Sequence, residues 1–151
     1  MAEYDVKTDD LLGRLDGSGS DDEWAAVAEL REGIGEALPT HLFERYKLAR
    51  RAPQRASCVY HSTRYARDSK EAVQLGIMAI RDRSKIVRYR ACALLAYSLS
   101  ADALPLLRVA LAEAEGETRD DLLAAIDAIE HQNSNYFLDR DHSGKFTFVV
   151  N

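Results

Sequence analysis

The feature that most constrains the fold of this chain is an internal repeat. The nine residues from Val87 to Leu95 return in similar form about 31 positions later, from Thr118 to Ile126, and residues 72–75 match residues 103–106 at the same spacing. A single helix pair cannot bury its apolar side, so a repeat of this length indicates helix pairs that stack on one another. We therefore expect an all-α helical-repeat solenoid of about 6–8 helices.

Local signals give the approximate positions of these helices. Ser20 or Asp21 suits the start of the first firm helix, and prolines at 39 and 53 open the next two. Trp24 is expected to anchor the core at one end of the stack. A short helix is also expected around residues 9–15. The firm helices are expected near residues 21–33, 39–49, 54–66, 69–80, 86–99, 102–111 and 117–131.

The repeat has the residue pattern of a known family. Val87-Arg88-x-x-Ala91-x-x-Leu94-Leu95, followed by Ala103-Leu104-Pro105-x-Leu107, resembles HEAT repeats over roughly residues 38–131. In that family the arginine of the Val-Arg pair joins a polar ladder between repeats, and Arg88 and Arg119 match its position. The resemblance implies a helical scaffold, since most members are scaffolds and fewer are enzymes.

The last twenty residues have a different pattern. Apolar and polar residues alternate over 136–140 and 145–150, on either side of a polar turn that contains Gly144. This alternation is typical of strands, and we expect a small C-terminal β-hairpin. The chain is thus expected to form a single domain over 1–151. Its parts are an N-terminal segment and loop at 1–20, helical repeats at 21–131 and the hairpin at 132–151.

The same turn raises the alternative of a calcium loop. Asp139, Asp141, Ser143 and Gly144 occupy positions 1, 3, 5 and 6 of an EF-hand-like loop. The twelfth position is Val150, where a bidentate carboxylate is needed. We therefore favour the hairpin turn.

Charge is strongly segregated along the sequence. The net charge of −5 is composed of −8 over residues 1–43, +9 over residues 44–90 and −6 over residues 91–151. Like charges gathered in one stretch create a field that extends about 10 Å into solvent and attracts an oppositely charged partner. The alternative is that the basic block pairs internally with its acidic neighbours.

No catalytic or metal-binding pattern stands out. The histidines lack the spacing of metal ligands, and Cys58 and Cys92 fall among apolar residues. Ser57 and His61 lie within one turn of one expected helix, and a single helix face rarely gives the convergent geometry that a nucleophile, a base and an orienting acid need. We expect no catalytic residue, no metal and no cofactor. The acidic start and the lack of a long apolar run predict a cytoplasmic protein with no membrane segment.

We therefore predict a non-enzymatic protein-binding module. Within this class we favour an immunity- or antitoxin-type protein that neutralises a toxin domain, because the chain also resembles small bacterial stand-alone HEAT-repeat proteins and its patterned charge would speed association. The alternatives are a generic HEAT-repeat adaptor and a nucleic-acid-binding protein that uses the basic block, although the acidic flanks oppose nucleic acid. The oligomeric state stays open. The residues expected to contact the partner are Arg45, Gln74, Met78, Arg81 and Arg108.

Overall fold

The computed structural model describes the backbone of residues 2–151 and the side chains of residues 6–151. Met1, which belongs to the predicted N-terminal segment, lies outside this part. The described chain is helical and contains no strand, which confirms the predicted all-α class. Its α-helices are α1 (Ala2–Gly13), α2 (Asp21–Ile34), α3 (Leu38–Leu48), α4 (Ala52–Ser62), α5 (Lys70–Ala79), α6 (Lys85–Ser98), α7 (Leu104–Glu113) and α8 (Gly116–Glu130).

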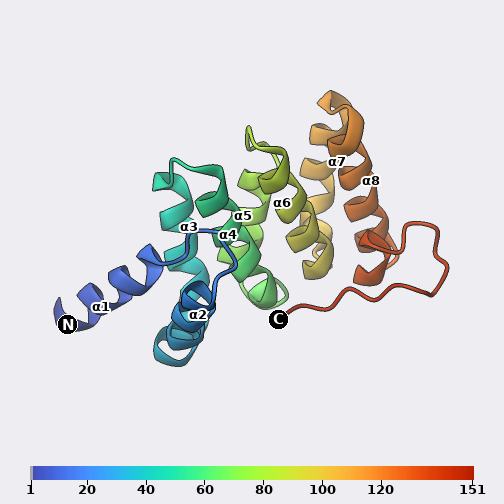
Figure 1. Ribbon diagram of the computed structural model, residues 1–151. Coiled ribbons are helices and arrows are strands. Elements are labelled where there is room, and N and C mark those ends of the chain that lie inside the picture. Colours follow the sequence, from blue (N-terminus) through green and yellow to red (C-terminus); the bar gives the residue numbers. More distant parts are fainter. Residues whose placement is uncertain (1) are drawn as a thin grey trace.

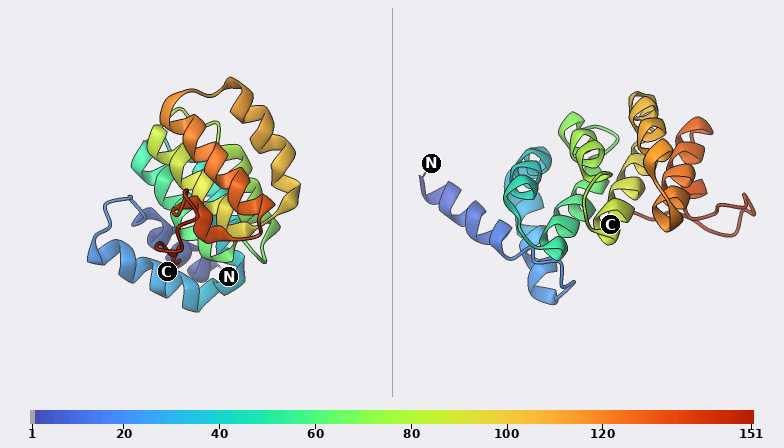
Figure 2. Two further views of the ribbon diagram at one scale, coloured as in Figure 1. Left: turned by 90° about the vertical axis from the view of Figure 1, so that its right-hand side faces the viewer. Right: turned by 90° about the horizontal axis from the view of Figure 1, so that it is seen from above.

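The helices from α3 to α8 form three consecutive pairs that lie in a row (Figure 1). Within each pair the two helices contact each other, and α6 lies at the centre, in contact with α4, α5 and α8. The helices α4, α6 and α8 lie next to one another along one side of the row, and α1 and α2 close its N-terminal end (Figure 2). We call the side formed by α4, α6 and α8 the even-helix side.

The helix boundaries follow from local chemistry. Ser20 and Ser69 accept hydrogen bonds from backbone amides in the first turns of α2 and α5, as expected of N-cap residues. Prolines 39, 53 and 105 lie in the first turns of α3, α4 and α7, where the missing N–H has no intrahelical partner to lose. These local signals confirm the predicted helix starts.

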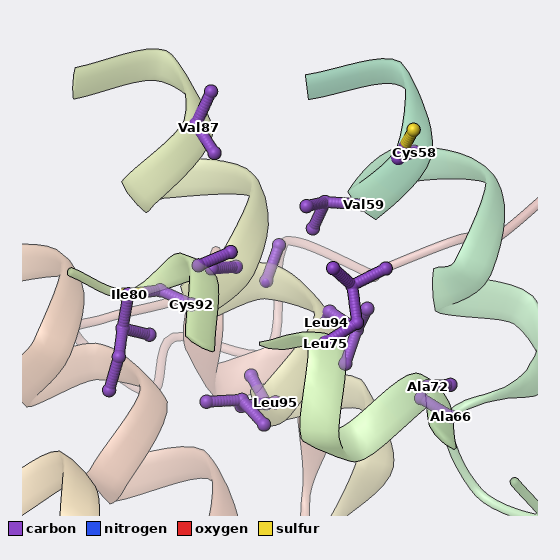
Figure 3. Packing of buried hydrophobic residues seen from close by; sticks show 14 of the residues in the cluster. Cys58, Val59, Ala66, Ala72, Leu75, Ile80, Val87, Cys92, Leu94 and Leu95 are labelled. Atoms are coloured by element: carbon purple, nitrogen blue, oxygen red, sulfur yellow. The ribbon is translucent and has the colours of Figure 1, made fainter. Parts of the chain in front are cut away.

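The helices α5 and α6 pack closely in the core. The side chains of Leu75, Leu94 and Leu95 are fully buried and lie against one another there (Figure 3). Gly76 makes the close approach possible, because a Cβ at this position would lie 2.8 Å from a methyl carbon of Leu94. A larger residue would force the two helices apart.

Arginine side chains link consecutive pairs through polar contacts. Arg55 of α4 reaches the turn before α6, where its Nε and Nη2 lie 2.8 and 3.1 Å from the two carboxylate oxygens of Asp82. Arg88 of α6 donates to the hydroxyl of Thr118 in α8 and to the carbonyl of Asp82. Arg119, which matches the same position by sequence, bonds instead to the end of α7, the helix just before its own.

The predicted C-terminal β-hairpin over residues 132–151 is wrong. Ser134–Phe137 forms a 3-10 helix, and extended coil follows the turn. The two carboxylate oxygens of Asp139 accept hydrogen bonds from the backbone amides of Ser143 and Gly144, at 3.0 and 2.7 Å. This side-chain-capped turn takes the place of a paired ladder, and it accounts for the spacing that resembled a calcium loop.

The second arm of the expected hairpin packs on helices instead of on a strand. Residues 145–151, which we call the tail, run back along the even-helix side toward α2 (Figures 1 and 2). Phe148 packs against Tyr97 of α6 and against Phe137, with ring centroids 5.8 and 6.0 Å apart. Burial of this ring against the helices outweighs the pairing that the alternating pattern suggested.

Candidate functional site

The residues predicted to contact a partner do not converge on one pocket. Arg45 is half-buried on α3, whereas the other four are exposed on α5, just after it, or on α7: Gln74, Met78, Arg81 and Arg108. Met78 and Arg81 line a hollow of about 530 Å³, and Arg45 lines a separate one of about 620 Å³. Arg81 lies 2.9 Å from Glu113 and Arg108 lies 3.7 Å from Glu130, so the charge of both is compensated by a neighbouring helix.

The basic block is neutralised internally only in part. Lys47, Arg55, Arg81 and Lys85 each pair with a carboxylate. Other cations of the block have no ion pair among the side chains of residues 6–151: Arg45, Arg50, Arg51, Arg64, Lys70, Arg83 and Arg90. Both interpretations of the block thus hold for different residues. The uncompensated cations are the ones available to an acidic partner.

A hollow lined by aromatic side chains lies where α2, α4 and α6 meet. It has a volume of about 410 Å³, and Trp24, Tyr60 and Arg90 are among its walls. The indole of Trp24 meets the rings of Tyr60 and His61 edge-on, with centroids 6.0 and 5.2 Å apart. The guanidinium carbon of Arg90 lies 4.9 Å from the centroid of Tyr60. Trp24 is therefore not the buried core anchor that the sequence predicted, because it is only half-buried and faces this hollow.

A buried carboxylate forms the floor of this hollow. Glu23 is 3% exposed, and its Oε1 accepts a hydrogen bond from the amide of Gly19. Its Oε2 lies 2.5 Å from the hydroxyl of Ser57 and 3.2 Å from Nε2 of His61, both on α4. Sequence reasoning considered Ser57 and His61 but missed Glu23, which α2 supplies. The only signal was its place three residues after Ser20, which is the pattern of a capping box.

This cluster joins α2 to α4 through hydrogen bonds and lacks the serine–histidine bond of a nucleophilic centre. A catalytic serine must donate its proton to a histidine, whereas Ser57 donates to Glu23 and His61 bonds to the same oxygen. Burial lowers the pKa of His61, although the hydrogen bond to Glu23 opposes this change. The imidazole is therefore neutral at pH 7 and donates through Nε2. Its Nδ1 has no hydrogen-bond partner in the described part of the chain.

Two further arginines, Arg31 and Arg64, lie close to each other, and Arg31 also lies near Tyr60, which lines this hollow. Arg31 of α2 donates to the carbonyl of Asn151, and its pKa is lowered first by burial and then by the nearby charge of Arg64. Neither Arg31 nor Arg64 has an ion pair among residues 6–151. We call the whole set the arginine–aromatic face. Its members are Trp24, Arg31, Tyr60, Arg64, Tyr89 and Arg90.

The thiols and the remaining polar groups offer no reactive or metal-binding centre in the described residues. Burial raises the pKa of Cys58 to about 12 and also raises that of Cys92, so both thiols stay protonated. The side chains of residues 6–151 include no group of three or more His, Cys, Asp or Glu that could hold a metal ion. A search of the described residues finds no helix with the length and apolarity that crossing a membrane requires.

Neither family models, nor curated proteins, nor solved structures match this chain.

Proposed function

We propose that this chain is a non-catalytic, HEAT-like helical-repeat module that binds an acidic surface of another protein through the arginine–aromatic face. One observation carries the proposal. Arg90 lines the hollow beside Tyr60, Arg31 lies near Tyr60 and Arg64, and none of these three arginines has an ion pair with a side chain of residues 6–151. Arg81 and Arg108, in contrast, are compensated by carboxylates on neighbouring helices.

The composition of this face suits a protein partner. Tryptophan, tyrosine and arginine are the residues enriched in the energetically important parts of protein interfaces. Arg31 also lies close to Arg64, and the two repel each other. An acidic group bound between them would relieve that repulsion and gain a charge-assisted hydrogen bond. The face thus has both an apolar contact surface and a charge that is available to a partner.

The helical-repeat part of the proposal is supported by the arrangement of the helix pairs. Consecutive pairs stack in one row, and Arg55 and Arg88 link each pair to the next. Such rows bury a continuous core between neighbouring units and leave their helix faces available for binding. The internal repeat at 31-residue spacing is a second, independent support for a helical-repeat architecture.

A narrower proposal is that the partner is a toxin domain and that binding neutralises it in the cytoplasm. Its support is the segregated charge, which would speed association with a complementary protein. Co-expression with a toxin encoded beside the gene tests it. Rescue of growth by the wild-type chain, and loss of rescue with a variant of the arginine–aromatic face, are expected. Failure to rescue from any such toxin would leave only the broader adaptor function.

The broader proposal is tested by comparing charge reversals on the two sides of the row. The first variant is Arg64→Glu/Arg90→Glu, and its matched control is Arg81→Glu/Arg108→Glu, which makes the same change in net charge on exposed or half-exposed arginines of the other side. Each is used to capture partners from the source cell after nuclease treatment, at low and moderate salt. A stoichiometric protein should be retained by the wild type and the control and lost from the first variant.

Two other results would contradict this proposal. Loss of the protein only from the control would place the binding surface on α5 and α7, where the sequence analysis expected it. Recovery of nucleic acid alone, with binding that falls steeply as salt rises, would show that the basic block binds phosphates. Circular dichroism must show that both variants stay folded.

A further inference from the structure

The tail is held on the even-helix side by a few contacts. The backbone amide of Phe148 donates to Oδ1 of Asn135 at 2.8 Å, and the Phe148 ring packs on Tyr97 and Phe137. Within the described chain, residues 145–151 make no backbone–backbone hydrogen bond. Phe146 and Val149 are 59% and 74% exposed. The contacts that hold the tail on the helices are therefore the ring and amide of Phe148, together with the hydrogen bond from Arg31 to the carbonyl of Asn151.

The tail is extended, so alternate side chains face the helices. Phe148 and Val150 are half-buried, whereas Val149 between them is exposed. Val150 lines a cavity of about 200 Å³ that is also lined by Tyr60 and Arg90. Tyr60 and Arg90 also line the hollow at α2, so the cavity beside the tail and the arginine–aromatic face have these two residues in common.

We propose that the tail occupies a peptide-binding groove of this chain and that a partner segment displaces it. This inference rests on the proposed function and specifies the partner. The partner segment is extended, carries an aromatic residue in the place of Phe148, and carries an acidic residue two positions later, in the place of Val150. The tail thereby acts as an internal competitor that sets the threshold for binding.

The structure supplies the reason for each requirement. The aromatic residue is needed because Tyr97 and Phe137 form the wall against which the Phe148 ring packs. The acidic residue is needed because the cavity beside Val150 contains Arg90, which has no ion pair among residues 6–151. The tail places a valine there and leaves this charge uncompensated. A partner with a carboxylate at that position would therefore bind more tightly than the tail itself.

The experiment uses the full chain and a labelled synthetic peptide with the sequence of residues 144–151. Its affinity is measured by fluorescence anisotropy for the wild type, for Phe148→Ala, and for Phe146→Ala as the matched control. A tethered segment acts at an effective concentration of about 1 mM, so a peptide with a Kd of about 100 µM should bind the wild type roughly tenfold more weakly than Phe148→Ala. Phe146→Ala should behave like the wild type, because Phe146 is largely exposed.

The acidic requirement is tested with a second peptide that carries a Val150→Glu change. It should bind Phe148→Ala several-fold more tightly than the unchanged peptide at low salt, and this gain should disappear in Phe148→Ala/Arg90→Glu. Val150→Lys, which places a cation in the cavity that Arg90 also lines and leaves the groove unchanged, provides a second way to release the tail. This second variant keeps the test valid if Phe148→Ala does not fold.

Equal peptide affinity for wild type and Phe148→Ala, or no binding to either tail-released variant, would overturn the inference. A gain that survives Arg90→Glu would overturn the acidic requirement. The assay does not involve the natural partner. If the peptides fail while partner capture still depends on Arg64 and Arg90, only the groove is refuted. If they succeed while capture is insensitive to those arginines, the proposed function fails instead.

Discussion

Replacement of Asp82 by alanine should be among the most destabilising single changes in this chain. Asp82 lies in the turn between α5 and α6, and its carboxylate accepts two hydrogen bonds from Arg55 of α4. It also accepts one from the hydroxyl of Tyr46 at 2.6 Å and one from the amide of Ser84. The side chains of Arg55 and Asp82 are only 7% and 5% exposed. Without Asp82, a buried guanidinium loses its counter-charge and two other donors lose their acceptor.

The magnitude follows from that geometry. Removing one partner of a buried, hydrogen-bonded ion pair typically costs about 3–5 kcal/mol, because the remaining charge stays buried without compensation. A chain of this size loses about 2–4 °C in Tm per kcal/mol, so Asp82→Ala should lower Tm by about 12 °C. Arg55 retains bonds to the carbonyls of Ala49 and Arg50, which keeps the loss from being larger.

Urea unfolding followed by circular dichroism measures this loss. Arg81→Ala is the matched control, because it removes an ion pair to Glu113 in which both side chains are more than half exposed, and it should cost less than about 1 kcal/mol. The double variant Arg55→Ala/Asp82→Ala should cost less than the sum of its single changes. A loss below about 1 kcal/mol for Asp82→Ala would refute the reasoning that this pair fixes α4 to the turn before α6.

Three further predictions concern other parts of the core. Gly76→Ala should reduce the free energy of unfolding by about 1–3 kcal/mol in urea titrations, because its Cβ would lie within 3 Å of two leucine methyls, whereas Gly33→Ala, which meets no atom within 4 Å, should not be destabilising. The pKa of His61 is lower in the folded chain than in the unfolded chain, so the free energy of unfolding should fall as pH drops below about 6.5. Urea midpoints at pH 7.5 and 5.5 should show this fall, and the difference between the two midpoints should be smaller in His61→Gln. Cys58 and Cys92 are fully buried and have raised pKa values. A thiol reagent at pH 8 should therefore label neither cysteine in the native chain and both in urea. Rapid labelling of the native chain would contradict their burial.

Much of the helical framework could be predicted because its signals are local. Ser20, Pro39, Pro53 and Ser69 each act within one turn of the helix that they begin, so their effect does not depend on the rest of the fold. The repeat added the expectation that these helices are paired. The observed starts of α2 to α5 agree with these signals.

The helix α4 shows where sequence reasoning stopped. The apolar spacing of residues 56, 59, 60 and 63 favours an inner face that includes Val59 and leaves Arg55 and His61 on other faces. In the structure both polar residues are buried, because α4 lies between α2 and α3 on one side and α6 on the other. Their partners, Glu23 and Asp82, are 38 and 27 residues away in sequence. Periodicity cannot reveal a polar contact whose other half lies on a distant helix.

The prediction of a C-terminal β-hairpin was wrong for a related reason. Alternation over residues 145–150 is typical of a strand, but a strand needs a neighbour with unpaired backbone groups. The carboxylate of Asp139 closes the turn by accepting a backbone hydrogen bond from Ser143, and the aromatic ring of Phe148 packs against Tyr97 and Phe137. The pattern correctly indicated an extended segment with one apolar side. It did not indicate that helices would cover that side.

The basic block also shows that position in the sequence does not determine the surroundings of a residue in the fold, and this difference bears directly on function. By sequence, Arg55, Arg88, Arg64 and Arg90 are equivalent members of one cationic stretch. The fold divides them, because Arg55 and Arg88 find Asp82, Thr118 and a backbone carbonyl between the helix pairs, whereas Arg64 and Arg90 face aromatic rings at the surface. An arginine whose charge is already bonded between the helix pairs is not available to bind a partner. The residues that remain uncompensated after folding, and not the net charge of the block, therefore define where an acidic partner should bind.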